Sequence, residues 1–238
     1  MKRMLFALLF LPAIAEAQQI SKFNDNDSLR LKSMTLPAAQ NIFSAKSLFV
    51  PGFFVAYGVS SLGNNGLKNL NLELKEEIQE NHPRFKTRLD DYLMFAPAAG
   101  AFMLEGAGVK GRHGLKDKLI IYGTGLGIMT ATVYVLKKIT HQLRPDGSKY
   151  NSFPSGHTAT AFMSAEFLSR EYGFRSHWYS YGGYAAAAGT GVLRMYNNKH
   201  WFADVVAGAG IGILSTKLSY WIFDKIETRK KHRVAVGY

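Results

Sequence analysis

The sequence predicts an all-α fold, an integral-membrane bundle of five or six spanning helices. Apolar segments recur six times along the 238 residues, and several approach the roughly 20 residues that a span requires. No stretch alternates apolar and polar residues with the period of two that strands show. Small residues within the segments, such as Gly182-Gly183 and residues 185–188, suit close helix packing in lipid.

The N-terminus has the pattern of a targeting signal. Two basic residues precede a short apolar run over residues 4–14, and an Ala-Glu-Ala cleavage pattern ends at Ala17. The run is shorter than the roughly 20 residues of a membrane span. We therefore predict a signal peptide over residues 1–17 and export in a bacterium, with an uncleaved membrane anchor as the alternative.

Residues 18–91 form an N-terminal segment ahead of the core. The apolar stretch 48–62, interrupted by Pro51, is expected to be an interfacial helix or a first membrane helix. The pattern over residues 70–78 predicts an amphipathic surface helix. Cleavage of the signal would leave both ends of the stretch 48–62 in the periplasm, as an interfacial or re-entrant helix. Without cleavage, the residues before it would be cytoplasmic and the bundle would have six spans.

The remaining apolar segments define a predicted core over residues 92–223. These segments are residues 92–109, 119–136, 158–168, 178–193 and 201–223. Three charged residues, Glu105, Glu166 and Lys217, lie inside them, which leaves a soluble helical bundle as the alternative. The small-residue content and the basic connections favour the membrane.

The distribution of charge predicts both the partners and the orientation. Lys and Arg number 29 against 17 Asp and Glu, and this net charge of +12 attracts anionic lipids or phosphorylated substrates. The basic residues fall between apolar segments, so no nucleic-acid partner is expected. By the positive-inside rule, the connections 110–118 and 170–177 and the tail 224–238 are cytoplasmic. The other helix ends would face the periplasm from the bacterial inner (cytoplasmic) membrane.

Three clusters of polar residues lie at these predicted periplasmic ends. They read Lys137-x6-Arg144-Pro145, then Pro154-Ser155-Gly156-His157, then Arg194-x5-His200-x3-Asp204. Taken singly, each residue has an ordinary interpretation as a cap, a turn or an interfacial cation. Three clusters with fixed internal spacing on one side of the bundle favour a shared site.

The residue types in these clusters suit a phosphate group. Lys137, Arg144 and Arg194 supply three positive charges, and the guanidinium forks match phosphate oxygens. Backbone N–H groups of Ser155, Gly156 and His157 would point at an anion from a helix N-terminus. The sequence therefore predicts a phosphate pocket at the periplasmic ends of the helices. Because the chain has no cysteine, thiol catalysis and cysteine-ligated metals are excluded.

Two histidines and one aspartate can supply the proton and covalent chemistry. His200 and Asp204 are four residues apart on a predicted helix and hence on one face. Asp204 can hold one ring nitrogen protonated, which leaves the other free to attack phosphorus. His157 can then protonate the leaving oxygen, and water would hydrolyse the phosphohistidine.

These motifs resemble those of the type 2 phosphatidic acid phosphatase superfamily, which also includes bacterial class A acid phosphatases and vanadium haloperoxidases. The resemblance covers roughly residues 92–223. It implies His200 as nucleophile, Asp204 as its partner and His157 as the acid. It also implies that no metal or other cofactor is needed. The phosphate-binding residues that it implies are Lys137, Arg144, Ser155, Gly156 and Arg194. The family usually has Ser before the third-motif Arg, where this chain has Leu193.

The long apolar run after His200 is similar to that of the membrane lipid phosphatases in the superfamily. We expect a phosphorylated membrane lipid as the substrate, with lipid A phosphate favoured and undecaprenyl diphosphate or phosphatidylglycerophosphate as alternatives. No obligate protein partner is inferred. A broad-specificity periplasmic acid phosphatase, a vanadate-dependent haloperoxidase and a non-enzymatic membrane scaffold or transporter are further alternatives.

Overall fold

The computed structural model describes residues 44–236, and side chains up to residue 230. The predicted signal peptide over residues 1–17 and the start of the N-terminal segment lie outside the described residues. Within the described range the chain is helical and contains no strand, which confirms the all-α prediction. The helices are α2 (Ala45–Ser61), α3 (Asn65–Asn81), α4 (Leu89–Leu93), α5 (Ala96–Gly106), α6 (Leu115–Thr140), α7 (Gly156–Tyr172), α8 (His177–Tyr196) and α9 (Phe202–Val236).

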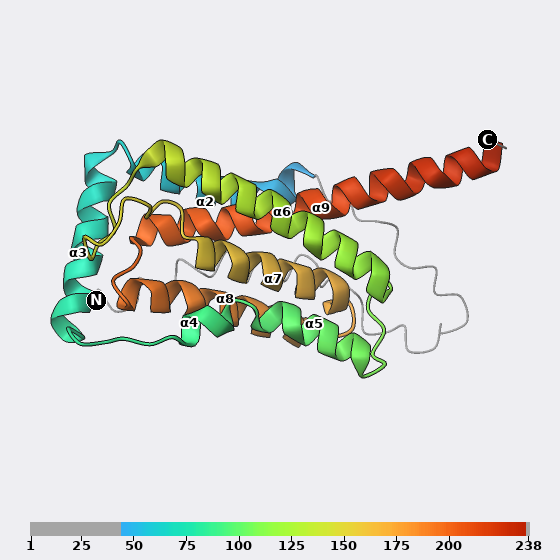
Figure 1. Cartoon of the computed structure of the whole chain (residues 1–238), viewed down its shortest axis with the longest axis horizontal. Coiled ribbons are helices and arrows are strands. Elements are labelled where there is room, and N and C mark those ends of the chain that lie inside the picture. The colour runs from blue at the N-terminus through green and yellow to red at the C-terminus, as the bar shows by residue number, and fades with distance from the viewer. Residues whose placement is uncertain (1–43, 237–238) are drawn as a thin grey trace.

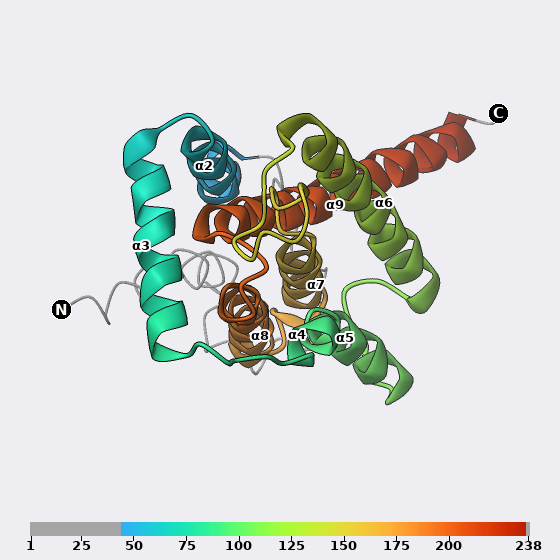
Figure 2. The same ribbon diagram turned by 60° about the vertical axis from the view of Figure 1, so that its left-hand side comes forward.

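Helix α7 is the centre of the bundle. It packs against α5, α6, α8 and α9, which surround it when the bundle is viewed toward its end (Figure 2). Almost every residue from Thr158 to Tyr172 is buried. Glycines on α9 allow the closest approach, because a Cβ at Gly212 would lie 2.2 Å from the carbonyl oxygen of Ala159. Backbone contact therefore fixes α7 relative to α9.

The charged residues inside the apolar segments are paired within the bundle. The buried carboxylate of Glu166 accepts a bond from Arg170 Nε at 2.5 Å, and Lys217 Nζ lies 3.8 Å from it. Glu105 pairs with the ammonium group of Lys118. Charges with partners can be buried inside a helical bundle, whereas lone charges in lipid are costly. These residues are thus compatible with a membrane location.

Helices α2 and α3 take different directions around this core. Helix α2 runs beside α9 along the bundle, whereas α3 turns by 93° and lies across one end (Figure 1). Asn64 caps α3 by accepting the Leu67 N–H with its side chain, and Leu74 and Ile78 are buried. Residues 70–78, for which the sequence predicts an amphipathic surface helix, lie within α3.

Two connections and a short helix also lie at the end of the bundle that α3 covers. The α6–α7 and α8–α9 connections and the short helix α4 lie there, while the second half of α9 projects beyond the opposite end (Figure 1). The sequence suggested one apolar segment over residues 92–109. The structure instead has two helices there, since α4 ends at Leu93 and α5 begins at Ala96. Pro97 lies in the first turn of α5, a position that proline favours because its missing N–H is not needed there.

Fewer helices qualify as membrane spans than the five or six expected from the sequence. Of the described helices, two are long and apolar enough, namely α6 and the part of α9 from Phe202 to Lys230. The bent pair of α2 and α3 would add a third if it forms one broken span. The difference arises because α5 and α7 are too short to count as spans, with 11 and 17 residues. Helix α7 also contains the charged residues Glu166, Arg170 and Glu171. Burial of α7 within the bundle removes the need for an apolar surface.

Candidate active site

The three motifs meet at the end of the bundle that α3 covers. Lys137 lies in the last turn of α6, and Arg144 follows in the α6–α7 connection. Ser155 caps α7, and Arg194 lies in the last turns of α8. His200 lies in the α8–α9 connection, just before α9 begins. Four connected helices thus bring all the predicted residues to one place.

His200 and Asp204 form the predicted pair. The Nδ1 atom of His200 lies 3.3 Å from Oδ2 of Asp204, one helical turn along the chain, and both side chains are buried. This contact occupies Nδ1 and leaves Nε2 as the nitrogen that can attack or accept a proton. In the described part of the chain, no other protein group bonds the ring.

The same carboxylate oxygen of Asp204 is fixed by two further donors. Ser152 Oγ donates to it at 2.5 Å, and the Trp201 backbone N–H donates at 3.0 Å. Ser152 was not among the residues predicted from the sequence. It belongs to no cluster of charged or acid–base residues, so only the fold reveals that it orients Asp204.

Positive charge surrounds the His200 imidazole. Burial lowers the pKa of His200 well below its usual value, and the charges of Lys137, Arg194 and Arg144 lower it further. His200 is therefore neutral at pH 7, which is the state that a nucleophile or base requires. Lys137 Nζ also donates to the backbone carbonyls of Asn151 and Ser152.

Two guanidinium groups have donors without protein partners. The buried Nε atoms of Arg144 and Arg194 bond no acceptor in the part of the chain that the structure describes. Buried donors without partners are costly, and those on charged groups more so. An anion with several oxygens, such as phosphate, would satisfy both atoms at once.

The start of α7 offers fewer free amides than the sequence suggested. The Ser155 N–H donates to the Asp204 backbone carbonyl at 3.0 Å, so it is not free for an anion. The Ser155 side chain caps α7 through the Thr158 N–H. The Gly156 and His157 amides are left at the helix N-terminus. A Cβ at Gly156 would meet only Val133 at 3.6 Å, so protein packing does not demand the glycine.

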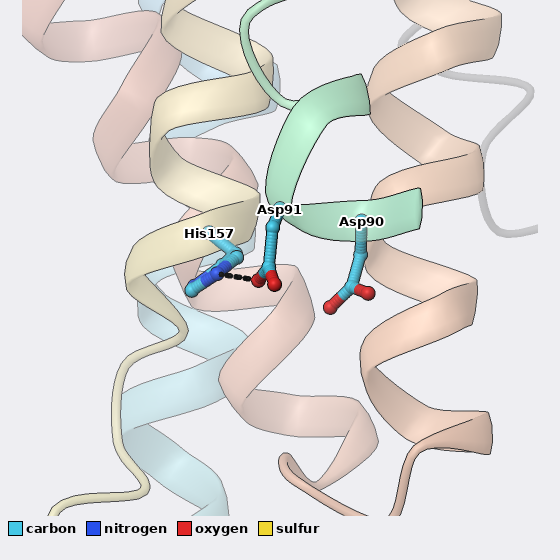
Figure 3. Close-up of side chains that lie close together, drawn as sticks. All are labelled: Asp90, Asp91 and His157. Carbon is cyan, nitrogen blue, oxygen red and sulfur yellow. Dashed lines mark hydrogen bonds and ion pairs between the residues drawn. The ribbon is translucent and has the colours of Figure 1, made fainter. Parts of the chain in front are cut away.

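Two carboxylates that the sequence analysis missed join the site from α4. Asp91 Oδ1 lies 2.9 Å from His157 Nε2, and Asp90 Oδ2 accepts from Arg194 Nη1 at 2.5 Å. Figure 3 shows Asp91 pointing at His157 and Asp90 lying beside α8. Their place at the edge of the segment 92–109, on the same predicted side as the motifs, was the available sequence signal.

His157 has competing influences on its proton affinity. Burial lowers the pKa of His157 and the Arg194 charge lowers it further, while the hydrogen bond to Asp91 acts in the opposite direction. The ligand atoms of Asp90, Asp91 and His157 lie within 4.8 Å of one another, so together they could hold a metal ion. Each carboxylate already has a cationic or imidazole partner, however, which reduces the charge available to a metal.

Helix α3 supports the connection that carries His200. Asn71 Oδ1 accepts the Ala203 N–H at 3.1 Å, and Lys75 Nζ lies 5.6 Å from the centre of the Trp201 ring. On the other side, Trp201 Nε1 donates to the Leu143 carbonyl at 2.8 Å. The His200 backbone is thus held between α3 and the α6–α7 connection.

Residues 118–227 match the sequence profile of the PAP2 superfamily. The match spans slightly less than half of the chain and includes all three motifs, so the chain resembles the PAP2 superfamily over these residues. All eight site residues predicted from the sequence lie inside the matched region, whereas Asp90 and Asp91 lie outside it. Within the matched region, Leu193 stands where the superfamily usually has Ser; it is half-buried and offers no side-chain donor.

The chain is similar to a curated protein and to two solved structures. A lipid A 1-phosphatase of Porphyromonas gingivalis is 43% identical over 143 residues, 60% of this chain and 32% of that protein. The chain thus spans about a third of that relative's length. A PAP2-type phosphatidylglycerolphosphate phosphatase of Bacillus subtilis is 20% identical, with a TM-score of 0.53 over 76% of this chain and 96% of that one. LpxE of Aquifex aeolicus is 28% identical, with a TM-score of 0.47 over 63% of this chain and 94% of that one.

The Bacillus protein, which is described as a transmembrane phosphatase, shares the helical fold of this chain. The shared fold and the two helices that are long and apolar enough to span support a membrane location for this chain.

Proposed function

We propose that this protein is a metal-independent lipid phosphate phosphatase that acts through a phosphohistidine intermediate on His200. The observation that carries the proposal is the buried His200–Asp204 pair, on which the positive charges of Lys137, Arg144 and Arg194 converge. The neutral imidazole supplies a nucleophile, and the three cations supply the environment that a phosphoryl group requires.

The first chemical step transfers the phosphoryl group to the protein. His200 Nε2 attacks phosphorus, the bond from phosphorus to the lipid oxygen breaks, and His157 gives that oxygen a proton. The Asp204 carboxylate stabilises the positive charge that develops on the His200 ring. Lys137, Arg144 and Arg194 stabilise the charge on the three equatorial oxygens, assisted by the Gly156 amide.

The second step regenerates the protein. Water attacks phosphorus while His157, now neutral, takes a proton from it, and the bond from phosphorus to Nε2 breaks. Inorganic phosphate leaves, and His200 returns to its neutral form. His157 thus acts as acid in one step and as base in the next.

Lipid A phosphate is the substrate that we favour. The 43% identity to a lipid A 1-phosphatase supports it, although that match covers 32% of the relative. The likeness to a phosphatidylglycerolphosphate phosphatase supports the fold alone, and undecaprenyl diphosphate is a further candidate. A water-soluble acid phosphatase is disfavoured by the two apolar helices that could cross a membrane.

We further propose that the protein lies in the bacterial inner membrane with its site facing the periplasm. The basic second half of α9 and the basic connection at residues 110–118 belong to the end away from the site (Figure 1). Basic residues favour the cytoplasmic side, so the site end would be periplasmic.

A substrate panel tests the proposed activity. The purified full chain in detergent is assayed for phosphate release from lipid A, undecaprenyl diphosphate, phosphatidylglycerophosphate and phosphatidic acid, with EDTA present and absent. We expect release from lipid A that is insensitive to EDTA and is lost in His200→Ala. A folded protein that releases phosphate from none of the four lipids would contradict the proposal.

A further inference from the structure

Helix α4 carries two neighbouring aspartates, Asp90 and Asp91, and each of them contacts a different motif of the phosphate site. The neighbouring carboxylates of Asp90 and Asp91 leave the helix in different directions, one beside α8 and one toward α7 (Figure 3). Each bonds a residue of a different motif, Arg194 and His157 respectively. A role in solvation alone would not require either contact.

The contact between Asp91 and His157 parallels the one between Asp204 and His200. In each pair a carboxylate binds one ring nitrogen, at 2.9 Å for Asp91 and 3.3 Å for Asp204. With Nε2 bound to Asp91, His157 Nδ1 is the nitrogen left for the substrate, and no protein acceptor bonds it in the described range. The contact therefore determines the orientation of the imidazole and which nitrogen carries the mobile proton.

Asp90 contributes through Arg194. Its side chain is 1% exposed and its carboxylate holds the guanidinium of Arg194, which is 10% exposed. Asn197 Nδ2 also donates to the carboxylate at 3.1 Å. This pairing places a negative charge next to the cation that most disfavours protonation of His157.

Charged and titratable groups face His157 from three sides of the site. They are Asp90 and Asp91 from α4, Arg194 from α8 and, across the site, His200. Burial is the largest influence and lowers the pKa of His157, and Arg194 lowers it further, whereas the two carboxylates raise it and offset part of the decrease. A general acid must carry its proton when the substrate binds, so this balance matters for the leaving-group step.

We propose that Asp91 is a positioning residue, which orients the His157 imidazole and increases the fraction of it that carries a proton for its role as general acid. The inference rests on the proposed function, because it assigns a partner to the acid of that reaction. Asp90 supports it by holding Arg194. A metal site built from the same three side chains is the competing interpretation, and it predicts different behaviour.

The central test compares pH profiles of Asp91 variants of the full chain in detergent. Asp91→Asn removes the charge but keeps an acceptor oxygen. We expect the pH at which kcat falls on the alkaline side to move down by about one unit, since a carboxylate at hydrogen-bonding distance raises the pKa of its partner by about that amount. KM should change less than twofold. Asp91→Ala, which also loses the orienting bond, should lower kcat by a further tenfold or so, a part of the ~100-fold that general acids supply.

Two controls give the comparison its meaning. Glu80→Gln removes an exposed carboxylate from α3 and should leave the profile unchanged. Asp91→Glu restores the charge and should recover part of the alkaline limb. An unchanged profile in both Asp91→Asn and Asp91→Ala would overturn the inference, and so would a change in KM alone.

Two further measurements separate the inference from its alternatives. Loss of wild-type activity in EDTA, restored by a divalent cation, would identify a metal site and overturn the positioning role. NMR titration of His157 needs no activity, so it decides the inference even if the wild type hydrolyses no lipid and the proposed function fails. We expect the His157 titration to move to lower pH in Asp91→Asn, and an unmoved titration would contradict the proposal.

Discussion

At the scale of single residues, the site depends on contacts between its two loops as well as on the motif side chains. Lys199 Nζ donates to Asp146 Oδ2 at 2.6 Å, which joins the α8–α9 connection to the α6–α7 connection. Burial acts against ionisation of Asp146, but bonds from Lys199 and Ser148 prevail and hold its pKa at about 2. The ion pair therefore keeps the loops that carry His200 and Arg144 together at neutral pH.

This pair predicts a pH-dependent loss of stability in Lys199→Met. A carboxylate with a lowered pKa stabilises the fold above its unfolded value, near 4, and this stabilisation disappears as the pH falls through about 2. Because Lys199 is 39% exposed, solvent reduces the contribution to about 1 kcal/mol. Thermal unfolding in detergent should show a Tm lower by roughly 2–4 °C at pH 7. The difference should shrink below pH 4, and Lys149→Met should show none.

The residue scale also shows where sequence reasoning stops. The predicted residues from Lys137 to Asp204 all lie at one end of the bundle, because fixed spacings locate them relative to helix ends. Ser152, Asp90 and Asp91 act through contacts between segments far apart in sequence, and no spacing encodes those. The Ser155 amide, expected to bind an anion, instead binds the Asp204 carbonyl, which only the packing of α7 on α9 reveals.

At the scale of helices, the backbone contact of α7 with α9 aligns two of the three motifs. A Cβ at Gly208 would lie 2.6 Å from the Ser155 carbonyl oxygen, and one at Gly212 would lie 2.2 Å from that of Ala159. Such distances leave no room for a methyl group. The second motif at the start of α7 is therefore held directly against the third motif at the start of α9.

This contact predicts that Gly212→Ala destabilises the protein. The added methyl group meets backbone atoms on α7, and overpacking of this kind costs about 1–3 kcal/mol. Gly127→Ala on α6 is the matched control, since a Cβ there meets nothing within 4 Å. Thermal unfolding in detergent should show a lower Tm for Gly212→Ala only. Equal Tm values for the two variants would contradict the close packing of α7 on α9.

At the scale of the whole molecule, all the described motifs share one end and the basic extension of α9 leaves the other (Figure 1). The all-helical fold and its apolar segments could be predicted, because hydrophobic periodicity is local. The number of membrane spans could not be predicted from the sequence. Glu166 on α7 has partners on its own helix and on α9, Glu105 on α5 has one on α6, and a count along the sequence cannot see which helix is surrounded by the rest.

The absence of cysteine allows a direct test of orientation. We expect Lys149→Cys, exposed in the α6–α7 connection at the site end, to react with a membrane-impermeant maleimide in cells with a permeable outer membrane. Thr228→Cys, exposed near the far end of α9, should react only after the inner membrane is opened. Labelling in the opposite order would place the site in the cytoplasm.

The central claim is that His200 carries the phosphoryl group, and trapping the intermediate tests it most directly. Lipid A labelled with ³²P on its phosphate is mixed with the full chain and quenched in alkaline detergent, where phosphohistidine survives. We predict label that is stable to alkali, is lost in acid, maps to His200 and is missing in His200→Ala. Label on another residue, or full phosphate release by His200→Ala, would contradict the account.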